Sequence, residues 1–160
     1  HPSYNCFSDP ELLKNEAMIL KRYCNSIGIN QSLFGARMHY LRWDQRITLA
    51  AYDSAGLDYD SSMTFADHAG FRCGTCFDYQ AFDVKNDTVL NFRVRPLIVM
   101  EASVLDDCYM GLGETDLALE KMLQLKNACR TVKGTFSVLW HNSRLVTHQS
   151  KKIYRDLIEN

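Results

Sequence analysis

The sequence predicts an α/β fold with parallel strands and outer helices. Three observations support this prediction: helical and extended patterns alternate along the chain, PLIVM and FSVLW are continuous apolar runs, and polar residues follow the candidate strands. Alternating helices and strands favour a parallel sheet, and continuous apolar strands suit a sheet that is covered on both faces. We expect one domain over residues 1–160, either a partial (β/α) barrel or an open sheet.

The partial barrel is the favoured alternative because the opening HPSYNC is typical of a loop between a strand and a helix. We therefore expect a strand directly upstream of His1, and we expect the first strands of the barrel to be missing from this chain. A closed barrel of this type uses about eight strands, which is more than the sequence offers.

The first predicted helix covers residues 8–28, SDPELLKNEAMILKRYCNSIG. Ser8 or Asp9 is the expected N-cap, Pro10 lies in the first turn, and Gly28 is the expected end. One apolar stripe recurs at helical spacing and consists of Leu13, Ala17, Leu20, Cys24 and Ile27. This face is expected to be buried.

The remaining elements are expected in this order: a strand over 32–40, a helix over 44–56, a strand over 57–62, a mostly irregular segment over 63–93, a strand over 95–101, a helix over 115–134, a strand over 135–142 and a helix over 150–160. Asp44 is the expected N-cap of the second helix. The helix over 115–134 has the clearest apolar face, made of Ala118, Met122, Leu125, Cys129 and Val132, and Gly134 marks its end.

The composition is typical of a soluble globular protein, with 46% hydrophobic and 23% charged residues. A net charge of −1 gives no electrostatic basis for binding nucleic acid or an anionic membrane. No apolar run approaches the ~20 residues that span a bilayer. There are six cysteines; Cys24 and Cys129 fall on apolar helix faces, and a chain of this length does not need disulfide bonds, so we expect a reducing compartment and a cytoplasmic location.

Polar side chains gather where the predicted strands end. The set comprises His1, Arg37, His39, Tyr40, Asp60, Glu101 and His141. In parallel barrels the reactive groups lie at the carboxyl ends of the strands, so the set indicates a site. These residues also have simpler explanations. His141 could be a capping or surface residue, and His39 could face solvent. Asp60 could cap a helix or pair with Arg37, and Glu101 could cap the loop that follows it.

A C-x-x-C pair, Cys73 and Cys76, lies in the irregular segment. Zinc sites need further ligands at set spacing, and redox pairs begin a helix. A tight turn with two partly buried thiols is therefore the favoured interpretation, and a small zinc or redox module is the alternative. The aromatic residues beside it, Phe77, Tyr79 and Phe82, are either caps of the core or a platform for a flat or sugar ring.

Four stretches together resemble a known family: HPSYN, GARMHYLRW, YDSSMTFADHAGFRCGTCFDYQAFD and GTFSVLWHNS. They resemble the bacterial polysaccharide deacetylase-like proteins, which are relatives of the NodB-type carbohydrate esterases. The likeness covers nearly the whole chain and keeps the order of the motifs. It implies a distorted (β/α)7-type barrel and metal-dependent hydrolysis of N- or O-acetyl groups on a carbohydrate substrate.

The resemblance also implies a divalent metal, expected to be zinc. HPSYN matches a His-x-x-x-His metal motif, which makes His1 the first ligand and puts Asn5 where the second histidine usually stands. Asparagine is a poorer zinc ligand than imidazole. A family motif that supplies two aspartates, a general base and a metal ligand, would lie upstream of His1.

Three further motifs imply catalytic residues. RMHY resembles the motif whose arginine steadies the catalytic aspartate and whose tyrosine N–H helps to hold the oxyanion, here Arg37 and Tyr40, with His39 in place of a usual proline. DSS resembles a motif in which Asp60 supports this arginine. LWH resembles the motif that supplies the general acid, His141.

The sequence therefore predicts the carboxyl-terminal part of a carbohydrate deacetylase. Because the aspartate pair is not in this chain, we expect the chain alone to be inactive. A degenerate, non-catalytic barrel that binds glycan or protein is the alternative, suggested by Asn5 and His39 at positions where the family has other residues. The expectation depends on His1 and His141 meeting at one pocket.

Overall fold

The computed structural model describes residues 1–159, and these fall into two compact units. Unit 1 comprises His1–Met63 and Asp78–Arg95, and the described part of unit 2 comprises Thr64–Phe77 and residues 96–159. Each unit is described by itself below. The prediction that residues 1–160 form a single domain stays a prediction.

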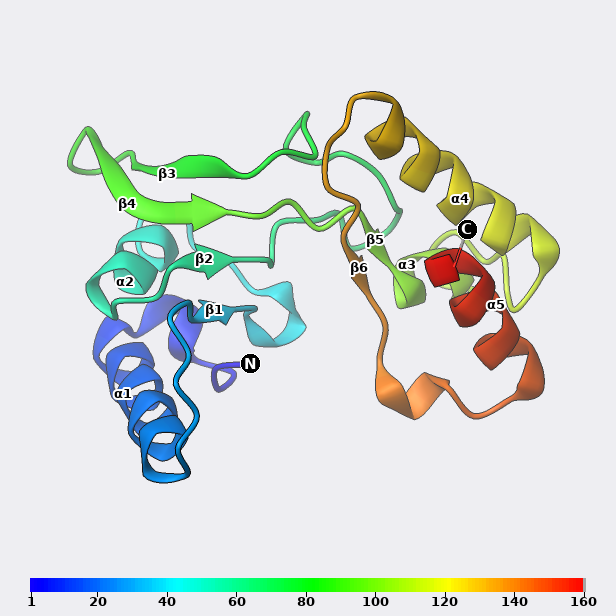
Figure 1. Cartoon of the computed structure of the whole chain (residues 1–160). Coiled ribbons are helices and arrows are strands. Elements are labelled where there is room, and N and C mark those ends of the chain that lie inside the picture. The colour runs from blue at the N-terminus through cyan, green and yellow to red at the C-terminus, as the bar shows by residue number, and fades with distance from the viewer. Residues whose placement is uncertain (160) are drawn as a thin grey trace. The chain divides into compact units, whose positions relative to one another are not determined.

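Unit 1 is built on a four-stranded mixed sheet. Its strands are β1 (Gly35–Ala36), β2 (Tyr59–Asp60), β3 (Tyr79–Asp83) and β4 (Thr88–Val94). The order is β1-β2-β4-β3, which Figure 1 shows from bottom to top. Strands β1, β2 and β4 are parallel, and β3 is antiparallel to β4. The parallel strands put the residues after Ala36 and Asp60 at the same edge of the sheet.

The prediction that residues 63–93 are mostly irregular is wrong, because this segment contains the hairpin of β3 and β4. Strand β4 alternates between buried and exposed side chains, with Leu90, Phe92 and Val94 buried and Val89 exposed. This is the period of a strand with one buried face. The Asp and Gly residues elsewhere in the segment favour turns and loops, so the segment as a whole has the composition of an irregular region.

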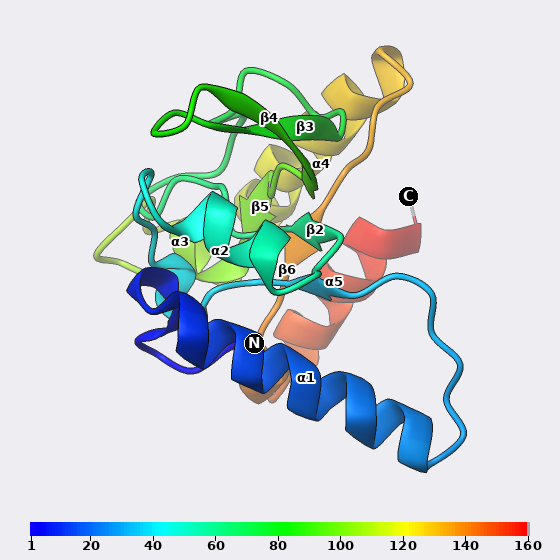
Figure 2. The ribbon, with the colours of Figure 1, turned by 90° about the vertical axis from the view of Figure 1, so that its left-hand side faces the viewer.

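Helix α1 (Pro10–Ser26) confirms the predicted start of the first helix, because the Asp9 side chain accepts a hydrogen bond from the Leu12 N–H at 3.0 Å. Figure 2 shows α1 as a long, regular helix. The predicted stripe is only partly buried: Leu13, Ala17 and Cys24 are buried, whereas Leu20 and Ile27 are exposed. Gly28 follows the helix with a φ of +75°.

Helix α2 (Thr48–Ser54) begins later than predicted. Asp44 does not cap it; its Oδ1 accepts from the Arg46 N–H in a turn that precedes the helix. The buried Tyr52 of α2 stacks on Phe92 of β4 with ring centroids 4.9 Å apart. Helix α2 thus packs on the sheet of unit 1 through an aromatic pair.

Unit 2 contains a pair of parallel strands and three helices. The strands are β5 (Val99–Met100) and β6 (Val138–Leu139), and the helices are α3 (Glu101–Leu105), α4 (Asp116–Thr131) and α5 (His148–Glu159). Met100 pairs with Leu139. Figure 1 shows α4 and α5 packed side by side. The parallel register brings the residues that follow β5 and β6 to one edge.

Helix α4 follows the sequence prediction closely. Thr115 caps it by accepting from the Ala118 N–H at 3.3 Å. Its buried face is Ala118, Met122, Leu125 and Cys129, whereas Val132 lies beyond the helix and is exposed. The residue with the left-handed backbone at its end is Lys133 (φ 57°) and not Gly134. Gly134 is required for another reason, because a Cβ there would overlap the Cys76 Sγ.

The fold is therefore mixed α/β with parallel strands and helices, as predicted at that level. Within residues 1–159 the strands form one sheet of four and one of two, and no closed barrel is present among them. The strands are shorter than predicted; over residues 32–40 only Gly35–Ala36 is extended in a sheet, because the chain turns at His39–Leu41. No helix of the described chain is long and apolar enough to cross a membrane.

Candidate functional site

The clearest candidate site in unit 2 is a glutamate–histidine pair at the carboxyl end of its parallel strands. Glu101 directly follows β5, and His141 lies two residues after β6. One carboxylate oxygen of Glu101, Oε1, lies 2.5 Å from His141 Nδ1 and accepts a second hydrogen bond from the His141 backbone N–H at 3.0 Å. The paired ends of β5 and β6 thus bring together two residues that are forty positions apart.

The two partners differ in their exposure to solvent. The Glu101 side chain is fully buried, whereas the His141 side chain is 47% exposed. A buried carboxylate bonded to Nδ1 fixes the orientation and tautomer of the imidazole. The other ring nitrogen, Nε2, is then the atom available to exchange a proton with a ligand. The pair has the arrangement of a positioned general acid or base.

Arg144 holds the loop that follows His141. Its guanidinium forms a bidentate ion pair with Asp106, with N–O distances of 2.5 and 2.6 Å, and its Nε lies 3.8 Å from Glu101 Oε1. The Arg144 backbone N–H donates to the His141 carbonyl at 2.9 Å. The hydrogen bonds that Arg144 donates to the Asp106 carboxylate raise the pKa of Arg144. The loop is therefore anchored on both sides of the imidazole.

A second group of predicted residues meets at the edge of the sheet in unit 1. Arg37 donates to the Ser61 carbonyl at 2.6 Å and to the Ser61 hydroxyl at 2.9 Å. Ser62 donates from its N–H and its hydroxyl to the two oxygens of Asp60, at 2.8 and 2.5 Å. The Ser62 hydroxyl also accepts from the Met38 N–H at 2.8 Å. The DSS motif thus joins the ends of β1 and β2.

Burial dominates the electrostatics of this group. Asp60 is fully buried, and burial raises the pKa of its carboxyl to about 6, against the opposing effect of its hydrogen bonds from Ser62. Burial also lowers the pKa of Arg37. Both oxygens of Asp60 are used internally, so this carboxylate acts on the loop that contains Ser61 and Ser62. Arg37 bonds to Ser61 and Asp60 bonds to Ser62, so both act on this loop, and the predicted support of Arg37 by Asp60 stays a prediction.

Tyr40, the remaining predicted catalytic residue, lies in the turn His39–Leu41 and has a left-handed backbone with a φ of 56°. Its side chain is 79% exposed. The role implied for its backbone N–H stays a prediction.

The predicted metal ligands do not by themselves fit a zinc site. The His1 ring lies edge-on to His39 at 5.8 Å, and Asn5 precedes a short 3₁₀ turn, where its carbonyl accepts from the Ser8 N–H. Within residues 1–159 no group of three or more His, Cys, Asp or Glu side chains could hold a metal ion, and zinc sites use three or four protein ligands. Because His1 belongs to unit 1 and His141 to unit 2, their meeting at one pocket stays a prediction.

The C-x-x-C pair lies in a tight turn, in agreement with the favoured interpretation. The Gly74 N–H donates to the Phe71 carbonyl at 2.9 Å, and Gly74 has a φ of +66°. Cys76 is buried and interacts with Cys129 of α4. Burial and a hydrogen bond with Cys76 raise the pKa of the Cys129 thiol to about 12, and a thiol held protonated in this way is a poor nucleophile.

The sequence places Glu101 at a strand end, where a loop cap is the simpler explanation, and the structure shows it bonded to His141. The usable signal is its position: Glu101 comes directly after the apolar run PLIVM, just as His141 comes directly after the apolar run FSVLW.

Comparisons of the chain with protein-family models, with curated proteins and with solved structures give no significant match.

Proposed function

We propose that this chain is part of a hydrolase that removes acetyl groups from carbohydrate, with His141 as the general acid. The observation that supports the proposal best is the 2.5 Å contact between the half-exposed His141 imidazole and the fully buried Glu101 carboxylate. The order of the family-like motifs in the sequence supplies the substrate class. A distorted (β/α)7-type barrel, to which these parallel strands would contribute, belongs to the same proposal.

In the proposed reaction, hydrolysis of the acetyl group leaves an amine or hydroxyl on the sugar that must gain a proton as the C–N or C–O bond breaks. The His141 Nε2 donates this proton, and Glu101 keeps the ring in the required orientation through Nδ1. Arg144, bonded to Asp106 and to the His141 carbonyl, fixes the loop that carries the ring. Each of these groups belongs to unit 2.

The metal enters this proposal through the resemblance alone, because His1 and Asn5 supply two donors and one of them is an amide. No step above is assigned to it. The cytoplasmic location is also part of the proposal, and it is supported by the burial of Cys24 and Cys129 on apolar helix faces, in a chain whose length does not require disulfide bonds.

The test is release of acetate from N-acetylchitotetraose and from other acetylated glycans by the longest natural protein that contains this chain, with and without a chelator. His141→Gln is expected to lower the rate by at least about 100-fold, the usual contribution of a general acid. The matched control is His148→Gln, which changes an exposed histidine of the same unit and is expected to leave the rate unchanged. Equal rates for both variants, or no acetate from any glycan, would contradict the proposal.

A non-catalytic protein that binds glycan is the second candidate, and the asparagine at position 5 favours it, since an amide is a weak zinc ligand. The same samples distinguish the two candidates. Binding of the acetylated oligosaccharide without any release of acetate would identify the second.

A further inference from the structure

Four rings gather on the surface of unit 1 where the chain leaves β1. They belong to His1, Tyr4, His39 and Tyr40, and all four residues are exposed. The His39 ring makes edge-to-face contacts with Tyr40, His1 and Tyr4 at centroid distances of 4.7, 5.8 and 6.3 Å. Tyr4 and Tyr40 are also edge-to-face, at 5.8 Å. We call this set the aromatic cluster.

Contacts with Arg42 and Ser62 fix the two segments that contain the aromatic cluster. The Arg42 guanidinium lies 4.0 Å from the centroid of the Tyr4 ring and 3.8 Å from that of Phe7, and it donates to the Tyr4 carbonyl at 3.1 Å. Met38, the residue before His39, is buried, and its N–H is bonded to Ser62. Both segments that carry the rings are therefore fixed to the body of unit 1, so the rings are positioned before any ligand arrives.

The backbone at the aromatic cluster is strained. Tyr40 and Leu41 are consecutive non-glycine residues in the left-handed region, with φ of 56° and 53°, a conformation that side chains with a Cβ disfavour. Tyr40 is nevertheless 79% exposed. Backbone strain of this kind clusters at active sites and ligand-binding segments.

We propose that the aromatic cluster binds a pyranose ring of a neutral oligosaccharide, so that the C–H groups of the sugar lie on the Tyr40 and Tyr4 rings. This inference rests on the proposed function for the choice of a sugar. The cluster itself favours a neutral polar ligand, because it joins aromatic faces to phenol and imidazole groups that can bond to hydroxyls and contains no carboxylate. The guanidinium of Arg42, which lies beside the cluster, is already stacked on Tyr4 and Phe7.

The experiment measures binding of N-acetylchitotetraose and of unacetylated cellotetraose to the chain of residues 1–160, by calorimetry or by NMR titration. Tyr40→Ala is expected to weaken binding of both sugars at least about tenfold, as removal of a central aromatic contact does. Tyr40→Trp keeps an aromatic face and is expected to retain binding. Circular dichroism of each variant verifies that it is folded.

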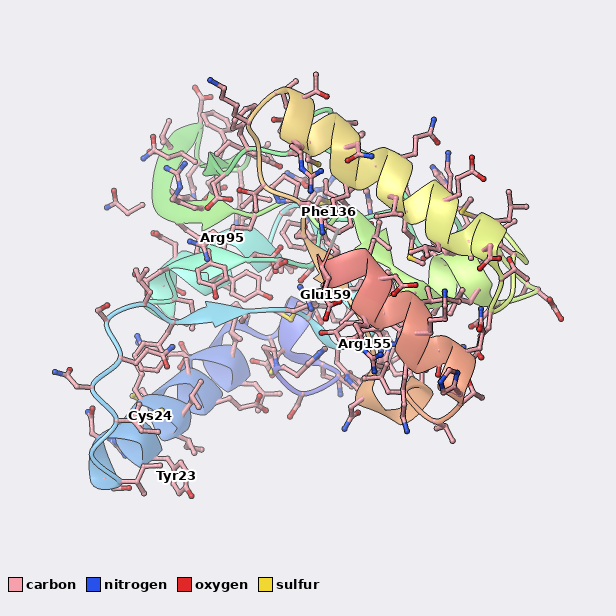
Figure 3. The ribbon with its side chains drawn as sticks, turned by 45° about the vertical axis from the view of Figure 1, so that its right-hand side comes forward. Tyr23, Cys24, Arg95, Phe136, Arg155 and Glu159 are labelled. Carbon is pink, nitrogen blue, oxygen red and sulfur yellow. The ribbon has the colours of Figure 1, made fainter. Side chains whose placement is uncertain are left out.

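The matched control is Tyr23→Ala. Tyr23 is an exposed tyrosine of the same unit that projects from α1 (Figure 3), and its removal is expected to leave binding unchanged. The proposal is overturned if the wild-type chain binds neither sugar, if Tyr40→Ala binds as the wild type does, or if a short oligothymidylate binds through Tyr40 more tightly than the sugars. Because binding is measured without turnover, loss of acetate release alone would contradict the proposed function and leave this inference intact.

Discussion

Each of the two units places a fully buried carboxylate at the carboxyl end of a parallel strand, but the two carboxylates have different partners. In unit 1, both carboxylate oxygens of Asp60 accept hydrogen bonds from Ser62, so this carboxylate bonds within a buried loop. Glu101 in unit 2 gives one oxygen to the half-exposed His141, and within the described residues its other oxygen, Oε2, has no hydrogen-bond partner.

This difference shows that the burial of a carboxylate does not by itself indicate whether the group stabilises the fold or positions a reactive side chain. A buried acid that bonds to buried groups stabilises a loop, whereas a buried acid beneath an exposed imidazole controls a group that a ligand can reach. We therefore expect removal of Asp60 to act mainly on the free energy of unfolding, and removal of the Glu101 charge to act mainly on turnover. The following predictions test this distinction.

The largest expected effect is on stability. Asp60→Ala leaves the N–H and hydroxyl of Ser62 without their acceptors in a buried site and creates a cavity, so the free energy of unfolding should fall by about 4 kcal/mol. Urea denaturation followed by circular dichroism measures it. Asp107→Ala, at an exposed aspartate, is the control and should change the value little. If both variants change the free energy of unfolding by a similarly small amount, the hydrogen bonds of Asp60 do not contribute to stability.

The next effect is on turnover. Glu101→Gln keeps the size of the side chain but removes the carboxylate that orients His141, so kcat for acetate release should fall about 100-fold with little change in KM. Glu101→Asp keeps the charge and should restore part of the activity. The control is Glu120→Gln on the exposed surface of α4. An unchanged kcat in Glu101→Gln, together with a large loss of stability, would make Glu101 a structural acid like Asp60.

A smaller effect concerns pH. Burial raises the folded-state pKa of Asp60 to about 6 from an ordinary value of 3.8, so the folded state binds the proton more tightly. Its contribution to stability is present at low pH and is lost as pH rises through about 6. The destabilisation caused by Asp60→Asn should therefore be smaller at pH 7.5 than at pH 4.5 by about 2 kcal/mol. Arg37 and Tyr52, the other ionisable groups that act on Asp60, keep their charge state in this range.

Denaturation of the wild type and of Asp60→Asn at the two pH values measures this difference. Because the result is a difference between two proteins, titration of the other carboxyl groups cancels. A destabilisation that is constant with pH, or larger at pH 7.5, would show that the pKa of Asp60 is not raised.

Local features were predictable from the sequence, and features that depend on strand pairing were not. The start of α1 follows from its N-cap, Asp9, and the buried face of α4 follows from its apolar period. The sequence does not distinguish the exposed residues Leu20 and Ile27 from the buried residues of the α1 stripe, because all of them fit the same helical period. Periodicity shows a face but not what covers it.

The candidate site illustrates the same limit. That polar residues follow each strand was visible in the sequence, and so was His141. That Glu101 is the partner of His141 depends on β5 lying beside β6, with Met100 opposite Leu139. The sequence does not state which strands are neighbours, so it could not distinguish Glu101 as a partner of the imidazole from Glu101 as a loop cap.

The smallest expected effect compares the left-handed residues of the two units. In unit 2 Lys133 ends α4 in a Schellman arrangement, in which the Lys133 and Gly134 N–H groups bond to the carbonyls of Arg130 and Cys129. In unit 1 Tyr40 lies in a loop and exposes a ring. Lys133→Gly and Tyr40→Gly should each raise the free energy of unfolding by about 0.5 kcal/mol, because glycine adopts this backbone without strain. Only Tyr40→Gly should also lose oligosaccharide binding, which separates a conformation that ends a helix from one that presents a ligand contact. If Tyr40→Gly gains stability and still binds the sugars, the Tyr40 ring has no role in binding, and the inference that the aromatic cluster holds the sugar is contradicted.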